Sequence, residues 1–387
     1  MVQGRFTRWI LNACLTTVLL LGNVNAYTQD KSGLRISLLT CSPGEDLYAL
    51  FGHTAIRVTD SVSLTDIVYN YGTFNFSDPN FYIKFARGKL LYYLSTEHFN
   101  DFAAGYYYEG RNIREQVIDA TESEKLEIYQ ALRDNLLEEN RYYHYDFFLD
   151  NCTTRPRDLL LKHLHPAPVL PAVMDTLTTF REAIHLYLNR GKQYWSKLGI
   201  DILLGARTDA VMQPMQQLFL PDNLMTAMDK STANNRVLLT SSPYVLQEKK
   251  NRAPMISPLV AIGFVSLLFA FITSRKIKGL ASWTDRLIFF ITGLLGVILV
   301  LMWVATDHTM TKNNYNLVWA LPTHLFISLW VNSDARWVRR YFLITAIVTG
   351  LLALVWFILP QQMNPALLPW VLLLVYRSSA KSISHAG

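Results

Sequence analysis

The sequence has few cysteines and lacks the patterns that hold a cofactor. Its 387 residues contain no metal-ligand spacing, no phosphate-binding glycine loop, no internal repeat and no low-complexity tract. These absences lead us to expect no cofactor and no bound metal. The three cysteines are Cys14, Cys41 and Cys152, and Cys14 falls in the expected signal peptide described below. The mature chain would therefore keep two cysteines, which allow at most one disulfide.

Charged residues are also scarce, at 17% against 51% hydrophobic residues, and the long apolar runs gather in the C-terminal third. A membrane-spanning helix needs about 20 residues. Five runs are candidates, at about 254–273, 287–305, 317–331, 341–359 and 365–376. The third and fifth are short, but flanking aromatic residues, which prefer the membrane interface, would extend them. We expect an all-α membrane domain of about five transmembrane helices.

Positive charges in this third lie in alternate segments between the apolar runs. They are Arg275, Lys276, Lys278, Arg286, Arg336, Arg339, Arg340, Arg377 and Lys381. With Asp285 and Asp334 they leave a surplus of seven, which accounts for the net charge of +6, so the charge does not call for a nucleic-acid partner. Short loops rich in Lys and Arg stay in the cytoplasm. This rule places the C-terminus in the cytoplasm and everything before residue 253 outside.

The N-terminus has the pattern of a secretory signal. Arg5 and Arg8 precede an apolar run at 9–21, which ends at the cleavage motif Val24-Asn25-Ala26. An uncleaved anchor is the alternative, and it leaves the topology unchanged. The expected divisions are a signal peptide at 1–26, an extracytoplasmic domain at 27–252 and the membrane domain at 253–387.

Hydrophobic alternation predicts four strands in the extracytoplasmic domain, at about 34–41, 53–58, 66–71 and 113–118. A short helical stretch is expected at 46–51. The capping-box pattern that begins at Thr121 predicts a helix through about Glu138. A further helix should begin near Asn151 and continue over 157–163, with Pro156 tolerated in its first turn. The fold class is therefore α+β.

Cys152 is the candidate nucleophile. Thiol catalysis needs a thiolate, a base within hydrogen-bond reach and a third group that orients the base. A helix start favours the thiolate, and the neighbouring Arg155 and Arg157 would lower the thiol pKa further. The alternative is a disulfide with Cys41, although Cys41 ends an apolar strand, where a free cysteine behaves as a small hydrophobe.

His53 is the candidate base, because it begins a predicted strand directly after a turn. Taken alone, a histidine at such a place is more often structural. Asn70 lies on the neighbouring predicted strand, and its amide oxygen could orient the imidazole, as in Cys-His-Asn enzymes. If Asn70 points toward His53, Tyr69 and Tyr71 must point to the opposite face. A turn or strand-end role for Asn70 remains open.

Several motifs together resemble the Lnb family of lipoprotein N-acyltransferases. They are Cys41-Ser42-Pro43-Gly44, the segment 51–58 around Gly52-His53-Thr54, Asn70-Tyr71-Gly72, the segment 145–155 around Asn151-Cys152-Thr153, and Asp307-His308, Asn314, Asn316-Leu317 and Trp319 in the membrane part. The resemblance implies a circularly permuted papain-like fold, related to NlpC-type peptidases and lecithin:retinol acyltransferase. The order of His53 before Cys152 agrees with it.

The resemblance also implies an activity and partners. A fatty acyl chain would pass from a phospholipid, through a thioester on Cys152, to the α-amino group of a diacylglyceryl-cysteine lipoprotein at the outer face of a bacterial inner membrane. A thioester reacts with an amine far faster than an oxygen ester does, so the two-step route is chemically sound. A cysteine hydrolase of the same fold and a non-catalytic membrane scaffold are the alternatives.

Further residues are candidates for supporting or substrate-binding roles. They are Asn151, Arg155, Tyr71, Asp307, His308, Asn314 and Asn316, and more weakly His324. The segment from Tyr69 to Tyr108 holds 14 aromatic residues in 40 against 13% in the whole chain. This density fits either a membrane-facing or acyl-binding surface, or an aromatic core. The Cys152 amide is the expected oxyanion donor, and a second donor is unassigned.

Overall fold

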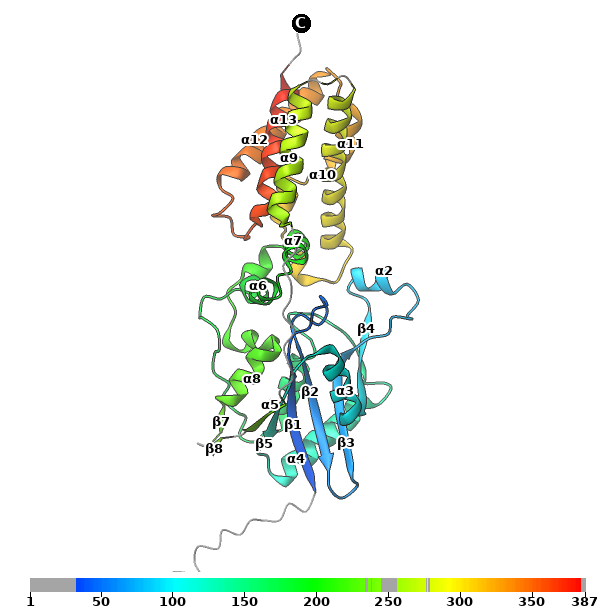
Figure 1. The fold of residues 1–387 in the computed structure, drawn as a ribbon, viewed down its shortest axis with the longest axis vertical. Coiled ribbons are helices and arrows are strands. Elements are labelled where there is room, and N and C mark those ends of the chain that lie inside the picture. The colour runs from blue at the N-terminus through cyan, green and yellow to red at the C-terminus, as the bar shows by residue number, and fades with distance from the viewer. Residues whose placement is uncertain are drawn as a thin grey trace, which may run out of the picture.

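The computed structural model describes residues 33–233, 236–237, 239–244, 256–275, 277 and 279–383. The expected signal peptide and the expected domain boundary at 252–253 lie outside these residues. Figure 1 shows an elongated molecule with an α+β domain at one end and a helical bundle at the other. Between them lie α6 (Phe180–Arg190) and α7 (Tyr194–Leu203). The expected fold class, an α+β domain followed by an all-α domain, is confirmed.

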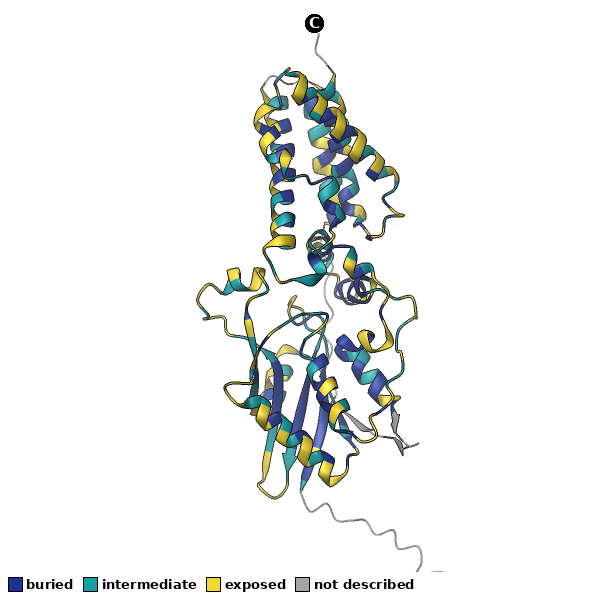
Figure 2. Cartoon of the chain, turned by 180° about the vertical axis from the view of Figure 1, so that it is seen from behind, coloured by how far each residue is buried: buried dark blue, intermediate teal, exposed yellow. Residues whose placement is uncertain are grey.

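The α+β domain is built on a seven-stranded antiparallel sheet with the order β6-β4-β3-β2-β1-β5-β9. The strands are β1 (Leu34–Cys41), β2 (His53–Asp60), β3 (Thr65–Thr73), β4 (Leu91–His98), β5 (Ile113–Ile118), β6 (Tyr142–His144) and β9 (Leu239–Tyr244). A separate ribbon pairs β7 (Thr232–Ala233) with β8 (Arg236–Val237). The central strands are largely buried (Figure 2). Their hydrophobic alternation is what made β1, β2, β3 and β5 predictable.

The other strands and one expected helix differ from the prediction. Strand β6 has three residues, and β9 at the sheet edge contains Pro243, which such an edge tolerates. Strand β4 was not predicted, because it lies within the aromatic segment 69–108, where the alternation of apolar and polar residues is weak. The helical stretch expected at 46–51 is a series of turns, in which the Gly52 amide donates to the Ala49 carbonyl oxygen. These turns reverse the chain before β2.

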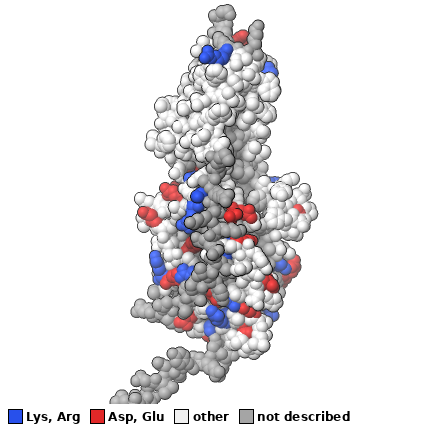
Figure 3. Space-filling model, viewed as in Figure 1, with Lys and Arg blue, Asp and Glu red and all other residues white. Residues whose placement is uncertain are grey.

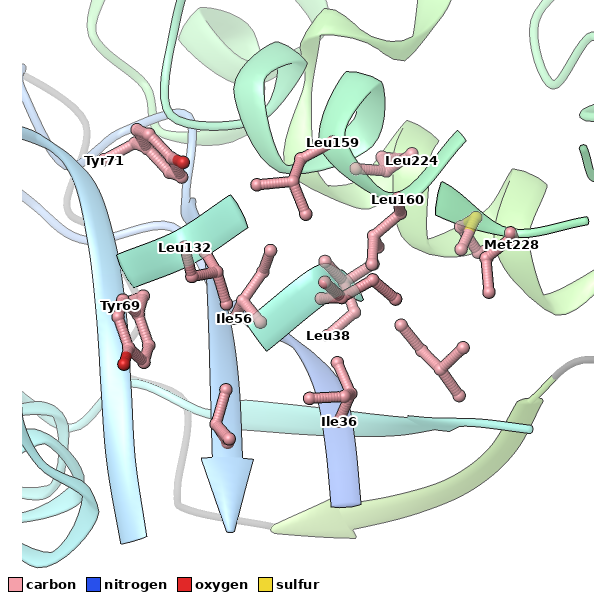
Figure 4. Packing of buried hydrophobic residues seen from close by; sticks show 14 of the residues in the cluster. Ile36, Leu38, Ile56, Tyr69, Tyr71, Leu132, Leu159, Leu160, Leu224 and Met228 are labelled. Carbon is pink, nitrogen blue, oxygen red and sulfur yellow. The ribbon is translucent and has the colours of Figure 1, made fainter. Parts of the chain in front are cut away.

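Helices cover both faces of the sheet. On one face α4 (Glu122–Leu136), α5 (Thr154–His163) and α8 (Pro221–Asp229) pack over β1 and β2. Their core, drawn in Figure 4, includes Leu38, Ile56, Leu132 and Leu160. On the other face α3 (Phe99–Glu109) packs over β3 and β4, and α2 (Phe81–Ala86) stands apart from the sheet. The capping box predicted for α4 is confirmed. Short 3-10 helices η1 (Ala206–Asp209) and η2 (Pro214–Phe219) complete the domain.

The bundle contains helices α9 to α13. Their bounds are α9 (Pro258–Ser274), α10 (Leu280–Val304), α11 (Thr323–Trp330), α12 (Arg336–Leu354) and α13 (Leu368–Ser382), with 3-10 helices η3 (Thr309–Thr311), η4 (Tyr315–Val318) and η5 (Pro365–Leu367). By length and composition, α10 and α12 are the two described helices that could cross a membrane, and α9 is apolar but shorter. Figure 3 shows a bundle surface almost free of charge, with Lys and Arg near its far end.

The third expected span, 317–331, is not one helix. It contains the end of η4, an irregular turn and the eight residues of α11, which rise only about 12 Å. The turn and α11 both lie against α10: a Cβ on Gly296 would stand 2.1 Å from the Ala320 carbonyl oxygen in the turn, and a Cβ on Gly293 would stand 2.0 Å from the Leu325 amide nitrogen in α11. Trp319 and His324 are fully buried there. Non-helical backbone at such a place is tolerated because protein surrounds it.

Several cations expected in loops lie inside helices instead. Arg377 in α13 donates to both carboxylate oxygens of Asp285 in α10, at 2.6 Å and 2.9 Å. Lys381 lies 3.0 Å from the same carboxylate. Because the charges are paired, α10 and α13 extend past the apolar runs that the sequence marks as spans.

Candidate active site

His53, Asn70 and Cys152 come together at the end of the sheet that faces the bundle. His53 begins β2, Asn70 lies on the adjacent β3, and Cys152 lies two residues before α5. His53 Nε2 lies 3.1 Å from Asn70 Oδ1, and the Cys152 thiol lies beside the His53 ring, since each of the two groups shifts the pKa of the other. With Nε2 donating to Asn70, the unprotonated Nδ1 is the ring atom left to accept the thiol proton. This is the tautomer that a general base requires.

The pKa values of the pair move toward each other. Burial alone would raise the pKa of the Cys152 thiol, but His53, the Thr54 amide and the Tyr145 hydroxyl together lower it. Burial would lower the pKa of His53, but Cys152 and Asn70 raise it. Both shifts favour the thiolate–imidazolium pair, which is the reactive form of a cysteine nucleophile.

Asn151 holds the loop that presents Cys152. Its side-chain oxygen accepts from the Thr153 and Thr154 amides at 2.7 Å and 2.9 Å, which gives two amides at the start of α5 an acceptor. Its amide nitrogen donates to the Phe147 and Phe219 carbonyl oxygens at 2.7 Å and 2.9 Å. Asn151 is buried and fully engaged, so it positions the nucleophile through the backbone.

Two glycines allow close backbone approaches at the site, Gly72 to Cys152 and Gly52 to Cys41. Gly72 has φ +92°, and a Cβ there would lie 3.3 Å from both the Cys152 Cβ and the Tyr145 ring. Gly52 has φ +79°, and a Cβ there would lie 2.6 Å from the Cys41 carbonyl oxygen. Each backbone conformation is strained for any residue with a side chain. Gly52 and Gly72 therefore fix the positions of His53 and Cys152.

Arg155 is committed to another partner. Its guanidinium donates to both oxygens of Asp150, at 2.7 Å and 2.8 Å, and lies 3.4 Å above the centre of the Tyr143 ring. We expected Arg155 and Arg157 to lower the pKa of the Cys152 thiol. The groups that lower it are instead His53, the Thr54 amide and the Tyr145 hydroxyl. Arg157 is likewise bonded, to Asp158 at 2.7 Å.

Tyr71 points away from the pair, as the strand alternation requires. It lies in the core on the α4 face (Figure 4), where its hydroxyl accepts from Asn135 Nδ2 at 2.8 Å. The residue is therefore part of the core and contacts helix α4. The contacts of Tyr71 indicate a role in the core and not the supporting role in the site that we expected.

Both described cysteines are free. Cys41 is fully buried and is the cross-strand partner of His53 in the β1–β2 register. Burial raises the pKa of the Cys41 thiol to about 12. A thiol of this kind is unreactive, so Cys41 acts as a small core residue beside the base.

Two residues outside the sequence-based candidates complete the site. The Tyr145 hydroxyl lies 3.9 Å from the Cys152 sulfur. Asn70 Nδ2 donates to Glu97 Oε1 at 2.8 Å, so a hydrogen-bonded series runs from His53 through Asn70 to Glu97. Tyr145 stands in a motif already noted, whereas Glu97 lies on β4, the strand that the sequence pattern did not predict. Among the described residues, no group of three His, Cys, Asp or Glu could hold a metal ion.

Two family descriptions match this chain. Residues 25–183 match the Lnb N-terminal periplasmic domain, and residues 248–386 match the Lnb transmembrane domain. The chain belongs to the Lnb family. Searches of curated proteins and of solved structures found no match. Family membership makes this a membrane-associated protein with a periplasmic domain, within a family of lipoprotein-modifying enzymes.

The loop after α10 joins the two Lnb domains next to the site. The Asp307 amide donates to the Arg87 carbonyl oxygen at 2.9 Å, and His308 Nε2 lies 3.2 Å from the Phe85 carbonyl oxygen. Thr309 Oγ1 donates to Asp146 Oδ2 at 3.3 Å. This part of the loop therefore braces α2 and the segment that leads to Cys152.

Asn314 and Asn316 lie further along the same connection. Asn314 Nδ2 donates to the Ile202 and Leu203 carbonyl oxygens at 2.8 Å and 3.1 Å. Asn316 Nδ2 lies 3.3 Å from the Asp201 carbonyl oxygen. Both asparagines are buried, so they attach the bundle to the end of α7 and do not face the catalytic group.

Proposed function

We propose that this chain moves a fatty acyl chain from a phospholipid to the N-terminal amine of a diacylglyceryl-cysteine lipoprotein, with Cys152 as the acyl carrier. The observation that carries the proposal is that Cys152, His53 and Asn70 lie together at the end of the sheet nearest the membrane domain. The pKa shifts of the pair and the Lnb family matches support it.

In the first half-reaction, His53 Nδ1 takes the thiol proton and the sulfur attacks the ester carbonyl carbon. The carbonyl oxygen becomes an oxyanion, which needs donors held in place before the reaction. The Cys152 amide and the Tyr145 hydroxyl are the groups we assign to it, the latter because it stands beside the sulfur. The C–O bond then breaks, and His53 returns the proton to the departing lysophospholipid hydroxyl. The acyl chain remains as a thioester.

In the second half-reaction, the lipoprotein amine attacks the thioester carbonyl carbon. An α-amino group has a pKa of about 7.7–8, so an appreciable fraction is neutral near neutral pH. His53 Nδ1 takes a proton from the attacking nitrogen, and the C–S bond breaks to form the amide. The proton passes to the sulfur, which restores the thiol. Asn70 keeps the ring oriented through both steps.

Intact-mass measurement tests the proposal. The purified protein is incubated with phosphatidylglycerol, and a diacylated lipopeptide is then added. We expect an acyl-sized mass increase on the wild type, its absence in Cys152→Ala, and its discharge to an N-acylated peptide. Steady release of fatty acid with no acylated peptide would identify a hydrolase instead. Full activity of Cys152→Ala would overturn the mechanism and favour a scaffold.

A further inference from the structure

A continuous series of aromatic rings begins at the nucleophile. The Tyr145 hydroxyl lies 3.9 Å from the Cys152 sulfur, and the Tyr145 ring stacks on Tyr92 with 4.5 Å between centroids. Tyr92 meets Phe74 edge to face at 5.3 Å. These rings come from β4, from the end of β3 and from the loop before α5, so the fold gathers them at one end of the sheet.

The series continues onto α2 and ends at the protein surface. Phe74 lies 4.9 Å from Phe76 and 5.9 Å from Phe81, and Phe81 stacks on Phe85 at 6.1 Å. Four apolar or aromatic side chains are exposed at this end: Phe76 (68%), Tyr82 (80%), Ile83 (59%) and Phe85 (53%). None of the six residues of α2 is buried. A helix with no buried residue is not stabilised by packing against the core of its own domain.

The exposed end of the series lies at the level where the bundle begins. The Phe85 carbonyl oxygen is hydrogen-bonded to His308, and the Arg87 carbonyl oxygen accepts from the Asp307 amide. Asp307 and His308 closely follow Val304, the last residue of α10. Figure 1 shows α2 beside this end of α10. Leu301, Trp303 and Val304 are exposed there as well, so apolar surface on α10 continues toward α2. A bilayer that covers α10 would meet α2 at its surface.

We propose that the α2 surface enters the outer leaflet of the membrane, and that the ring series Phe85–Phe81–Phe74–Tyr92–Tyr145 binds the acyl chain of a phospholipid on its way to Cys152. The inference rests on the proposed function and adds the place where the acyl donor is held. An acyl chain would otherwise have to cross water between the bilayer and the nucleophile. Each methylene exposed to water on that path costs free energy. The aromatic series replaces that water with apolar contacts.

Photocrosslinking locates the bound chain without requiring turnover. The full-length Cys152→Ala protein is placed in vesicles of phosphatidylglycerol and phosphatidylcholine that contain a phosphatidylglycerol with a diazirine in its acyl chain. We expect the crosslinks in the α+β domain to fall within residues 74–92 and at Tyr145. Crosslinks confined to the bundle, or spread evenly over the domain surface, would overturn the inference.

A pair of matched double variants gives the functional test. Phe76→Ser with Phe85→Ser removes two exposed rings from the α2 surface. Val62→Ser with Leu64→Ser removes two apolar side chains that are more exposed (74% and 88%) at the β2–β3 turn, the opposite end of the sheet. The readout is the rate of Cys152 acylation by vesicle phosphatidylglycerol divided by its rate of acylation by a water-soluble short-chain ester. We expect this ratio to fall about tenfold or more in the α2 variant and to stay unchanged in the control.

The two proposals fail in different ways. If wild-type Cys152 accepts an acyl group from neither donor, the proposed function is wrong, whereas crosslinks at 74–92 would still report lipid binding there. If wild-type Cys152 is acylated by phospholipid and the α2 variant keeps the wild-type ratio, the proposed function stands and the lipid-binding inference is overturned.

Discussion

The Cys152 thiol is the residue on which the chemistry depends, and its titration is directly measurable. His53, the Thr54 amide and Tyr145 outweigh burial and lower its pKa. We expect alkylation by iodoacetamide to rise with pH through a midpoint below that of an ordinary thiol. His53→Ala should move the midpoint upward, because it removes the imidazolium that stabilises the thiolate. An unchanged midpoint in His53→Ala would contradict the assignment of His53 as partner.

Glu97 should act through Asn70 as a positioning residue. Its carboxylate accepts the Asn70 side-chain N–H at 2.8 Å, which leaves the Asn70 oxygen directed at His53. Glu97→Ala removes that acceptor, and a hydrogen bond to a charged group is worth about 1.5–3 kcal/mol, so we expect kcat to fall at least tenfold. Glu97→Gln keeps a carbonyl oxygen and should retain most of the rate.

The pH profile separates this role from a merely structural one. In Glu97→Ala the His53 imidazole is held less firmly, so the part of the pH–rate profile that reports His53 should shift. The profile of Glu97→Gln should follow the wild type. Glu122, exposed in the first turn of α4, supplies a control substitution to Ala with no expected change. Loss of activity in Glu97→Ala with an unchanged profile would count against positioning.

The resemblance to the Lnb motifs, more than the local pattern, singled out His53 as the base, because a histidine at a strand start is by itself more often structural. The sequence could not show Glu97, because the alternation of β4 lies within an aromatic segment. It also misled about Arg155. Two arginines next to a cysteine indicate a positive field only while they are unpaired, and the pairing with Asp150 depends on how the loop folds.

At the scale of elements, α6 and α7 are joined by a buried ion-pair network. Arg181 on α6 donates to Asp201 on α7 at 2.9 Å, and His185 Nε2 lies 2.8 Å from the same carboxylate. Asn364, from the loop before η5, donates to the other oxygen of Asp201 at 2.8 Å. The network therefore ties the bundle to the α+β domain.

Replacing Asp201 with Ala should destabilise the protein by about 1.5–3 kcal/mol, because Arg181 keeps Asp209 as a partner at 2.9 Å but loses its hydrogen bond to the Asp201 carboxylate. Thermal unfolding in detergent measures the loss. Glu138→Ala is the control, since the exposed Glu138–Arg141 pair should contribute about 1 kcal/mol or less. Equal stability changes in the two variants would show that the network is not a structural tie.

The same carboxylate predicts a pH dependence. Burial would raise the pKa of Asp201, but the His185 hydrogen bond, Arg181 and Asn364 together lower it. A group with a lowered pKa in the folded state contributes stability above its unfolded pKa, and loses that contribution as pH falls through its folded pKa. The stability difference between wild type and Asp201→Ala should therefore shrink as the solution becomes strongly acidic.

In the bundle, hydropathy predicted a helix correctly where the apolar run is also regular helix, as in α10 and α12. It failed at 317–331, where the apolar run is not one helix. The run at 317–331 is apolar enough to suggest a span. Gly293 and Gly296 on α10 have no side chain, which lets the backbone of this run pack closely against α10. Hydropathy averages over such a segment and carries no information about its backbone. The ends of α10 and α13 were misjudged for a related reason, since pairing of Asp285 with Arg377 lets charges remain within the helices.

At the scale of the whole molecule, the arrangement predicts an orientation in the membrane. The catalytic group and α2 lie at one end of the bundle, and Arg377 and Lys381 lie in the last turns of α13 at the other end. Positively charged ends of membrane helices stay in the cytoplasm. The α+β domain should therefore face the periplasm and the C-terminus the cytoplasm, which gives the catalytic domain access to the outer leaflet.

Single cysteines introduced into a Cys14→Ala, Cys41→Ala, Cys152→Ala background can test this orientation. Ser63 is exposed in the β2–β3 turn, and Ile383 is exposed just after α13. A membrane-impermeant maleimide should label Ser63→Cys in intact spheroplasts and label Ile383→Cys only after the membrane is permeabilised. The reverse pattern would place Cys152 in the cytoplasm, where the surrounding leaflet and the available lipoprotein termini differ. Labelling of both sites in intact cells would mean that the bundle crosses the membrane an even number of times, so the charged end of α13 would have to be stabilised outside by its pairing with Asp285 alone.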